Sequence, residues 1–107
     1  MEKIEKVIRD GQVAVLISPG YGTGWYSWNG VEALLFHPQL VELVEANRRE
    51  EITQELLFEL TGEEHVYAGG AEDLEIVWVP IGTQFLIDEY DGAESLTFIE
   101  NLRPITA

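Results

Sequence analysis

The spacing of apolar residues changes from a helical period to a strand period near residue 63. Between Pro38 and Leu60 the apolar residues recur every three or four positions, as on one face of a helix. From Glu64 onward, short apolar runs with a period of two are separated by glycine and proline, which is typical of strands joined by turns. Helices followed by strands in one chain of 107 residues predict a single α+β domain over 1–107 with an antiparallel sheet.

The helical block carries two apolar stripes that do not fit one straight helix. The first stripe consists of Leu40, Leu43 and Val44, and the second of Ile52, Leu56 and Leu60. At about 100° per residue the two stripes would lie on different sides of one helix. Asn47 and Glu50 have the spacing of a capping box, so we expect two helices, over 39–46 and 48–60. Gly62 is expected to cap the second.

Two Asp-Gly pairs, Asp10-Gly11 and Asp91-Gly92, predict the turns of β-hairpins. Strands are expected over residues 3–9, 12–17, 65–68, 74–79, 84–90 and 96–99. The strands over 12–17 and 74–79 are apolar on both faces, which favours places near the centre of the sheet. The predicted fold is an antiparallel sheet of about five or six strands with the two helices packed on one face. The apolar run over 31–36 is too short to assign to helix or strand.

Residues 18–30, here called the glycine loop, contain four glycines, two tryptophans and two tyrosines. Glycine permits positive φ angles and close backbone approach, and the aromatic rings offer flat apolar faces. We expect backbone N–H groups of this loop to hold a phosphate or carboxylate, and Tyr21, Trp25 and Trp28 to stack on a base or sugar. The alternative is structural, with rings that cover a sheet edge and glycines that let the chain bend.

Two acidic loops at strand ends, Glu72-Asp73 and Asp91-Gly92 with Glu94-Ser95, are candidates for the same site, provided that the fold brings them beside the glycine loop. Their carboxylates would accept hydrogen bonds from ribose hydroxyls or a base amino group, while Arg9, Arg48 or Arg49 would contact phosphates. The alternative is that these Asp and Gly residues only form turns. The predicted ligand-binding residues are Gly20, Tyr21, Gly22, Gly24, Trp25, Trp28, Asn29, Glu72, Asp73 and Asp91.

The usual parts of catalytic and metal sites are missing from the sequence. The two histidines, His37 and His65, have no partner at a metal-ligand spacing, and the chain has no cysteine. No serine lies in a G-x-S-x-G elbow, and neither the Walker motif nor the dinucleotide fingerprint is present. We therefore expect a protein that is not an enzyme, with no catalytic residue, metal site or cofactor.

The net charge of −14 lies entirely in residues 31–107, where three basic residues face 17 acidic ones. Such a field repels DNA, RNA and anionic membranes and attracts basic protein surfaces, although in many proteins it serves only solubility. No apolar run approaches the ~20 residues of a membrane span, and no targeting leader is recognisable. We expect a cytoplasmic protein that binds neither nucleic acid nor membrane directly, and whose sheet edge or helix face could form a homo-oligomer.

Three segments resemble small uncharacterised proteins of bacteriophages and prophages. They are Ser18-Pro-Gly-Tyr-Gly-x-Gly-Trp-x-x-Trp, Gly-Gly-Ala-Glu-Asp-Leu over 69–74, and Glu-Tyr-Asp-Gly-x-Glu-Ser over 89–95. Phage proteins of this size include anti-defence proteins, among them sponges for cyclic nucleotide signals and acidic inhibitors of nucleic-acid-binding effectors. With the features of the glycine loop, the predicted function is a non-catalytic sponge in the host cytoplasm. It would sequester a cyclic nucleotide or a cyclic ADP-ribose type signal in the glycine loop. The alternative is an acidic inhibitor or nucleic-acid mimic that docks on a basic host protein.

Overall fold

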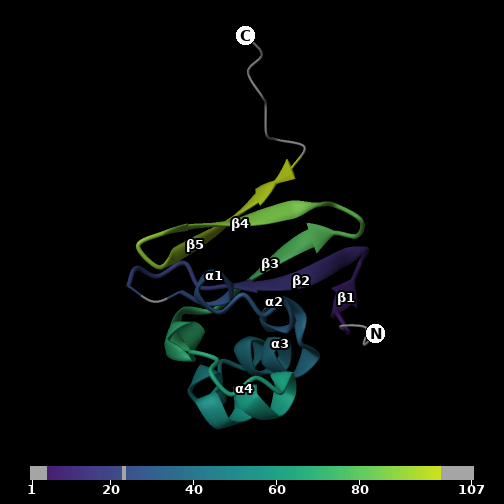
Figure 1. Cartoon of the computed structure of the whole chain (residues 1–107). Helices are drawn as coiled ribbons and strands as arrows, with labels where there is room; N and C mark the ends of the chain where they lie inside the picture. Colours follow the sequence, from purple (N-terminus) through teal and green to yellow (C-terminus); the bar gives the residue numbers. More distant parts are fainter. Residues whose placement is uncertain (1–4, 23, 100–107) are drawn as a thin grey trace.

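The chain forms three layers, which from top to bottom of Figure 1 are a β-hairpin, a three-stranded sheet and a layer of helices. The computed structural model describes residues 5–22 and 24–99. Its strands are β1 (Ile8–Arg9), β2 (Gln12–Ile17), β3 (Glu75–Pro80), β4 (Phe85–Tyr90) and β5 (Ala93–Phe98). Its helices are α1 (Tyr26–Asn29), α2 (Ala33–Phe36), α3 (Pro38–Glu45) and α4 (Gln54–Thr61), with 3-10 turns η1 (Arg49–Glu51) and η2 (Gly69–Asp73). The predicted α+β class is confirmed.

β2 is the central strand of the three-stranded sheet, whose order is β1-β2-β3 with antiparallel pairing. Asp10 and Gly11 both have positive φ angles, so the predicted β1–β2 hairpin is confirmed. Of the strand predicted over 3–9, only Ile8–Arg9 forms β1, and residues 3 and 4 lie outside the described residues. Side chains of β2 are buried on both faces, because alternate residues pack on the helices and on the hairpin of β4 and β5. The predicted two-sided burial of this strand is thus also confirmed.

β3 lies at the edge of its sheet, so the prediction that it lies near the centre is wrong. It pairs with β2 along its whole length, from Gln12–Pro80 to Ile17–Glu75. Both faces of β3 are apolar for a different reason, because, among the described residues, β3 has no strand on its other side in this sheet. Ile76 and Trp78 pack on the helical layer, and Val77 and Val79 pack on the hairpin layer. Burial of both faces therefore comes from the three-layer architecture.

The hairpin of β4 and β5 is a separate two-stranded sheet, so the prediction of one sheet with five or six strands is wrong. Its turn is Asp91-Gly92, both with positive φ, as predicted. The inner face of the hairpin carries Phe85, Ile87, Leu96 and Phe98, which pack on Val15, Ile17 and Val79 of the first sheet. Phe85 also meets Phe36 of α2 edge to face, with ring centroids 6.3 Å apart. The hairpin pairs face to face with the first sheet rather than edge to edge.

The two predicted helices correspond to α3 and α4, which cover the other face of the sheet. The prediction that the second begins at 48 is wrong, because residues 49–51 form the 3-10 turn η1 and Thr53 is extended. Asn47 is not an N-cap either, since its positive φ of 56° places it just after the end of α3. Thr53 is the actual N-cap of α4, and its hydroxyl accepts a hydrogen bond from the Leu56 N–H at 3.1 Å. Gly62 caps the C-terminus as predicted. Within residues 5–22 and 24–99, no helix has the length and apolar character that crossing a bilayer requires.

Residues 31–36, left unassigned above, contain α2, and the strand predicted over 65–68 does not form. The hydrogen bonds of Tyr67 explain why no strand forms over 65–68. Its backbone N–H donates to the Asn29 side chain at 2.8 Å, and its carbonyl accepts from the Asn29 amide at 2.9 Å. Both backbone groups that a strand would use in a sheet are thus satisfied by one side chain.

The N-cap of α3 predicts a pH dependence of stability. The His37 ring nitrogen Nδ1 accepts a hydrogen bond from the Gln39 N–H at 3.2 Å, which requires an unprotonated nitrogen. Burial lowers the pKa of His37 below its usual value, and the charge of Glu5 opposes this only in part. The unfolded chain therefore binds the proton first, and the free energy of unfolding should fall as the pH drops from about 7.5 through the unfolded pKa near 6.5.

The measurement is urea unfolding at two pH values on either side of that window. We expect a loss of up to about 1 kcal/mol, the usual contribution of an N-cap hydrogen bond. His37→Asn keeps a capping acceptor that does not titrate, so this variant should lack that part of the pH dependence. Equal losses in His37→Asn and the native protein would refute the assignment.

Candidate functional site

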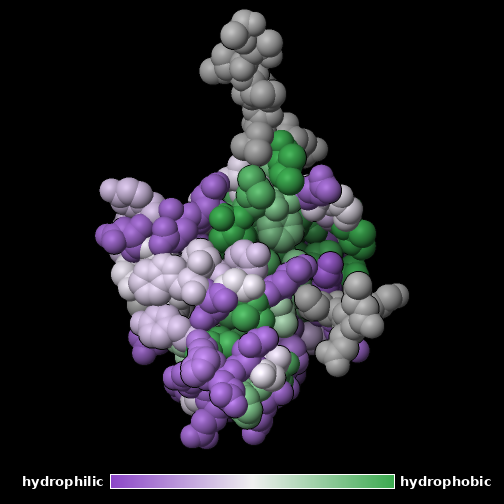
Figure 2. Space-filling view, viewed as in Figure 1, coloured by the Kyte–Doolittle hydropathy of each residue, from purple (hydrophilic) through white to green (hydrophobic). Residues whose placement is uncertain are grey.

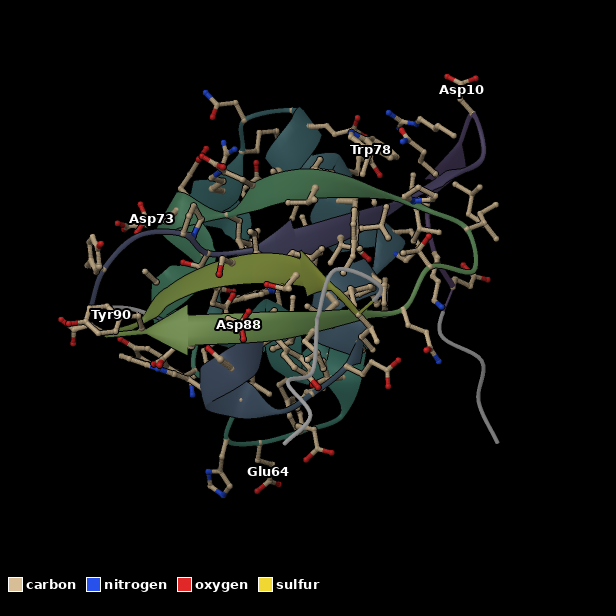
Figure 3. All side chains as sticks on the ribbon, turned by 90° about the horizontal axis from the view of Figure 1, so that it is seen from above. Asp10, Glu64, Asp73, Trp78, Asp88 and Tyr90 are labelled. Carbon is tan, nitrogen blue, oxygen red and sulfur yellow. The ribbon has the colours of Figure 1, made fainter. Side chains whose placement is uncertain are left out.

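The glycine loop lies where three segments meet at one end of the molecule. It begins at the end of β2, and its last part contains α1. Gly22 donates its N–H to the carbonyl of Asp91 in the β4–β5 turn at 2.6 Å, and Gly20 lies directly against the side chain of Asp73 in η2. Figure 3 shows Asp73 and Tyr90 at this end, with Asp10 at the other. The fold thus brings both predicted acidic loops beside the glycine loop.

A buried carboxylate from β5 organises the loop. Glu94 is only 3% exposed, and its own N–H donates to the carbonyl of Ser18 at 2.8 Å. Oε1 accepts from the Ser18 N–H at 3.0 Å, and Oε2 accepts from the N–H groups of Trp25 at 3.1 Å and Ser27 at 2.7 Å. The Ser27 hydroxyl adds a bond of 2.7 Å to the same oxygen. These four donors compensate the desolvation of the carboxylate.

The anion that these N–H groups hold is therefore part of the chain itself. The sequence predicts a loop whose backbone donors bind a phosphate or carboxylate of a ligand. In the structure the donors of Ser18, Trp25 and Ser27 are taken by Glu94, and that of Gly22 by a backbone carbonyl. A carboxylate is indeed held, but it ties the loop to β5. A ligand phosphate could use these donors only by displacing Glu94.

Trp25 is a core residue, so its predicted role as a stacking platform does not agree with its position. It has no exposed surface, and it packs with Leu34, Leu40 and other residues of the helical layer. Its indole N–H donates to the Leu34 carbonyl at 2.9 Å. A ring with every face covered by the protein offers none to a base or sugar. The contacts of Trp25 therefore agree with the alternative that the aromatic rings of the loop have a structural role.

Glycines in the loop and in η2 allow the two segments to pack closely. A Cβ at Gly70 would lie 2.4 Å from the Gly24 carbonyl oxygen, and one at Gly20 would lie 2.3 Å from a carboxylate oxygen of Asp73. A Cβ at Gly24 would lie 2.4 Å from the indole of Trp28, which rests on the backbone there. Gly70 needs glycine because the backbone of the glycine loop occupies the space of a side chain there, whereas a side chain at Gly20 or Gly24 would displace that of Asp73 or Trp28.

Four exposed aromatic rings surround this end of the molecule, here called the aromatic end. Their exposed fractions are 74% for Tyr21, 46% for Trp28, 45% for Tyr67 and 77% for Tyr90. Trp28 and Tyr67 stack with ring centroids 5.8 Å apart and planes at 24°. The Asn29 side chain fixes the backbone of Tyr67 and also donates to the Trp25 carbonyl at 2.8 Å. The ring pair is therefore held by its neighbours rather than free to rotate.

Carboxylates accompany these rings. Glu89 accepts the indole N–H of Trp28 at 2.8 Å and the Gly92 N–H at 3.2 Å with the same oxygen. The exposed Asp91 lies in the turn, and Tyr90 faces away from Glu89 because strand residues alternate. Glu72 and Asp73 line a small hollow of about 360 Å³ with Pro19, Gly20, Arg49, Leu74 and Glu75. The charge at this end is predominantly negative.

The arginines proposed for phosphate binding have other partners in the structure. Arg9 binds Glu45 through both of its terminal nitrogens, at 2.5 and 2.7 Å, and the pair lowers the pKa of Glu45. Arg48 pairs with Glu51. Only Arg49 lies near the glycine loop, and it donates to the Leu74 carbonyl at 2.9 Å and to the side chain of Asn47. One of the three arginines is therefore placed beside the loop.

The predicted ligand-binding residues do not include Glu94, Tyr67 or Tyr90, although Glu94 belongs to one of the two predicted acidic loops. A signal for Glu94 exists, since it shares a strand face with the apolar Leu96 and Phe98. A glutamate on the inner face of a strand must find compensating donors, which the glycine loop supplies. Tyr67 carries no comparable signal, because only the tertiary structure places it on Trp28.

In the part of the chain that the structure describes, no group of three or more histidine, aspartate or glutamate residues is arranged to hold a metal ion. His37 serves as the cap of α3. No family model, curated protein or solved structure matches the chain.

Proposed function

We propose that this protein is a non-catalytic binding module whose aromatic end docks on a basic surface of a partner protein. The observation that carries the proposal is the stacked pair of Trp28 and Tyr67, which is half exposed and has the Glu89 carboxylate on its indole N–H. Tryptophan and tyrosine are the residues that most often anchor protein interfaces. A ring face beside a carboxylate suits a lysine or arginine side chain, through a cation–π contact and an ion pair.

The overall charge supports a basic partner. A net charge of −14 accelerates the approach of a positive surface and opposes the approach of nucleic acid. The contacts of the loop add to this argument, since Glu94 already occupies donors that a phosphate would need. An acidic inhibitor of a nucleic-acid-binding host protein, as in phage anti-defence, fits both features.

A second candidate function is sequestration of a nucleotide-derived signal, with the rings of Tyr21 and Tyr90 as stacking platforms. Their high exposure favours this candidate, because each leaves most of its ring open to a base. Arg49, beside Gly20 in the small hollow, is the group that would contact a phosphate. The two candidates differ in the charge of the ligand and in the rings that they require.

The test compares two probes on the same variants. An unstructured, fluorescently labelled arginine-rich peptide represents the basic partner, and a panel of mono-, di- and cyclic nucleotides represents the signal. We expect the peptide to bind the native protein in a salt-dependent manner, and Trp28→Ala to weaken binding by about tenfold. Phe58→Ala is the matched control, because Phe58 is equally exposed but lies on α4, and it should change affinity by less than about twofold.

The nucleotide arm is read by thermal shift. A stabilising nucleotide whose effect is lost in Tyr21→Ala or Tyr90→Ala, together with a peptide that does not bind, would replace the first candidate by the second. A saturating ligand at about 100 times its Kd adds about 2.7 kcal/mol, which a melting curve resolves. If Trp28→Ala and Phe58→Ala affect both probes equally, neither proposal stands.

A further inference from the structure

A groove between α3 and α4 lies in the helical layer, away from the aromatic end. It has a volume of about 900 Å³ and an apolar floor that includes Leu43, Leu56 and Leu60. Leu56 and Leu60 are one turn apart on α4 and are only half-buried, although they also contact the core. The helices that border it have eight residues each, so a groove along them is about 12 Å long. This length matches about two turns of a third helix.

The rim of the groove is acidic. Glu5, Glu42, Glu51 and Arg48 line it, and Arg48 pairs with Glu51. The carboxylates of Glu5, from the N-terminal segment, and Glu42, from α3, therefore set the charge of the rim. Residues 38–64, which include both helices, carry eight glutamates and two arginines. Figure 2 shows the same contrast, with hydrophilic residues over the helical layer and apolar residues visible between them.

We propose that this groove docks an amphipathic helix of a partner protein, with basic residues beside its apolar stripe. An apolar floor between two helices accepts side chains at positions i, i+3, i+4 and i+7 of a third helix, which is a recurring mode of peptide recognition. Lysine or arginine next to that stripe complements Glu5 and Glu42. A second copy of this chain is a poor occupant, because two acidic rims and two charges of −14 would meet.

The probe is a synthetic helical peptide with leucine along one face and lysine elsewhere, compared with the same peptide carrying glutamate in place of lysine. Fluorescence anisotropy at physiological salt should show binding of the lysine peptide and none of the glutamate peptide. Leu60→Lys changes the floor and Glu42→Lys changes the rim, and each should weaken binding by at least about tenfold. Since Glu42 is exposed, Glu42→Lys tests the proposal even if Leu60→Lys does not fold.

Two control variants lie on α4 outside the groove. Glu59→Lys makes the same change as Glu42→Lys, and Phe58→Lys introduces a lysine at an apolar position, as Leu60→Lys does. Each control should alter affinity by less than about twofold. Equal losses in test and control variants would show that the acidic field alone attracts the peptide, and would overturn the proposal. A native dimer that Leu60→Lys converts to monomers would also overturn it, because the groove would then be a self-interface. Trp28→Ala should leave this binding unchanged, which separates the groove from the aromatic end.

Discussion

Replacing Glu94 by alanine is expected to lower the free energy of unfolding by about 3 kcal/mol or more. The substitution removes the acceptor of three backbone N–H groups, at Ser18, Trp25 and Ser27, in an interior where Glu94 is 3% exposed. Each buried donor left without an acceptor costs about 1 to 3 kcal/mol. The loss is a large part of the 5 to 15 kcal/mol that stabilises a typical domain. Urea unfolding followed by tryptophan fluorescence measures it.

Two variants separate the carboxylate from other effects. Glu94→Gln keeps the volume of the side chain, so a loss close to that of Glu94→Ala assigns the effect to the charged acceptor rather than to packing. Glu59→Ala changes an exposed glutamate of α4 and should cost no more than about 0.5 kcal/mol. A loss below about 1 kcal/mol in Glu94→Ala would contradict the role of Glu94.

Chemical rescue makes this prediction more specific. Glu94→Ala should leave a small cavity lined by the three donors, which formate can enter as a substitute for the carboxylate. Formate should therefore raise the unfolding midpoint of Glu94→Ala more than that of Glu59→Ala, at an ionic strength matched with chloride. Equal responses to formate and chloride would show that the donors find water instead.

Replacing Trp25 by alanine is expected to cost about 3 to 5 kcal/mol, as for other large aromatic residues in cores. Trp25 has no exposed surface, and its indole N–H is bonded to the Leu34 carbonyl. Trp25→Phe should cost less, because most of the ring volume remains while the hydrogen bond is lost. Melting curves of both variants beside Trp28→Ala would give the order Trp25→Ala, Trp25→Phe, Trp28→Ala, from most to least destabilised.

This order decides how binding experiments with the two tryptophans are interpreted. Loss of binding in Trp25→Ala would follow from a damaged loop, and it would not identify a stacking contact. Trp28 is the informative position, since its ring is partly exposed and its neighbours hold it in place. A Trp28→Ala variant less stable than Trp25→Ala would refute the assignment of Trp25 to the core.

Local patterns in the sequence determined the α+β class, both Asp-Gly hairpins, the two-sided burial of β2 and the Gly62 cap. These features depend on residues close together in the chain. A positive φ angle at an Asp-Gly turn or at the end of a helix is a property of a few neighbouring residues. The continuous apolar run over 13–17 likewise shows that this strand is buried on both sides.

The tertiary structure alone decided which strands share a sheet and which side of the glycine loop faces the core. Alternation gives the burial of a face but not the partner that covers it, so β3 at an edge and a central strand have the same pattern. Trp25 and Trp28 have the same hydropathy, yet one is in the core and the other is exposed. The loop's anion is Glu94, 76 residues from Ser18, and only the packing of β5 on the loop brings them together.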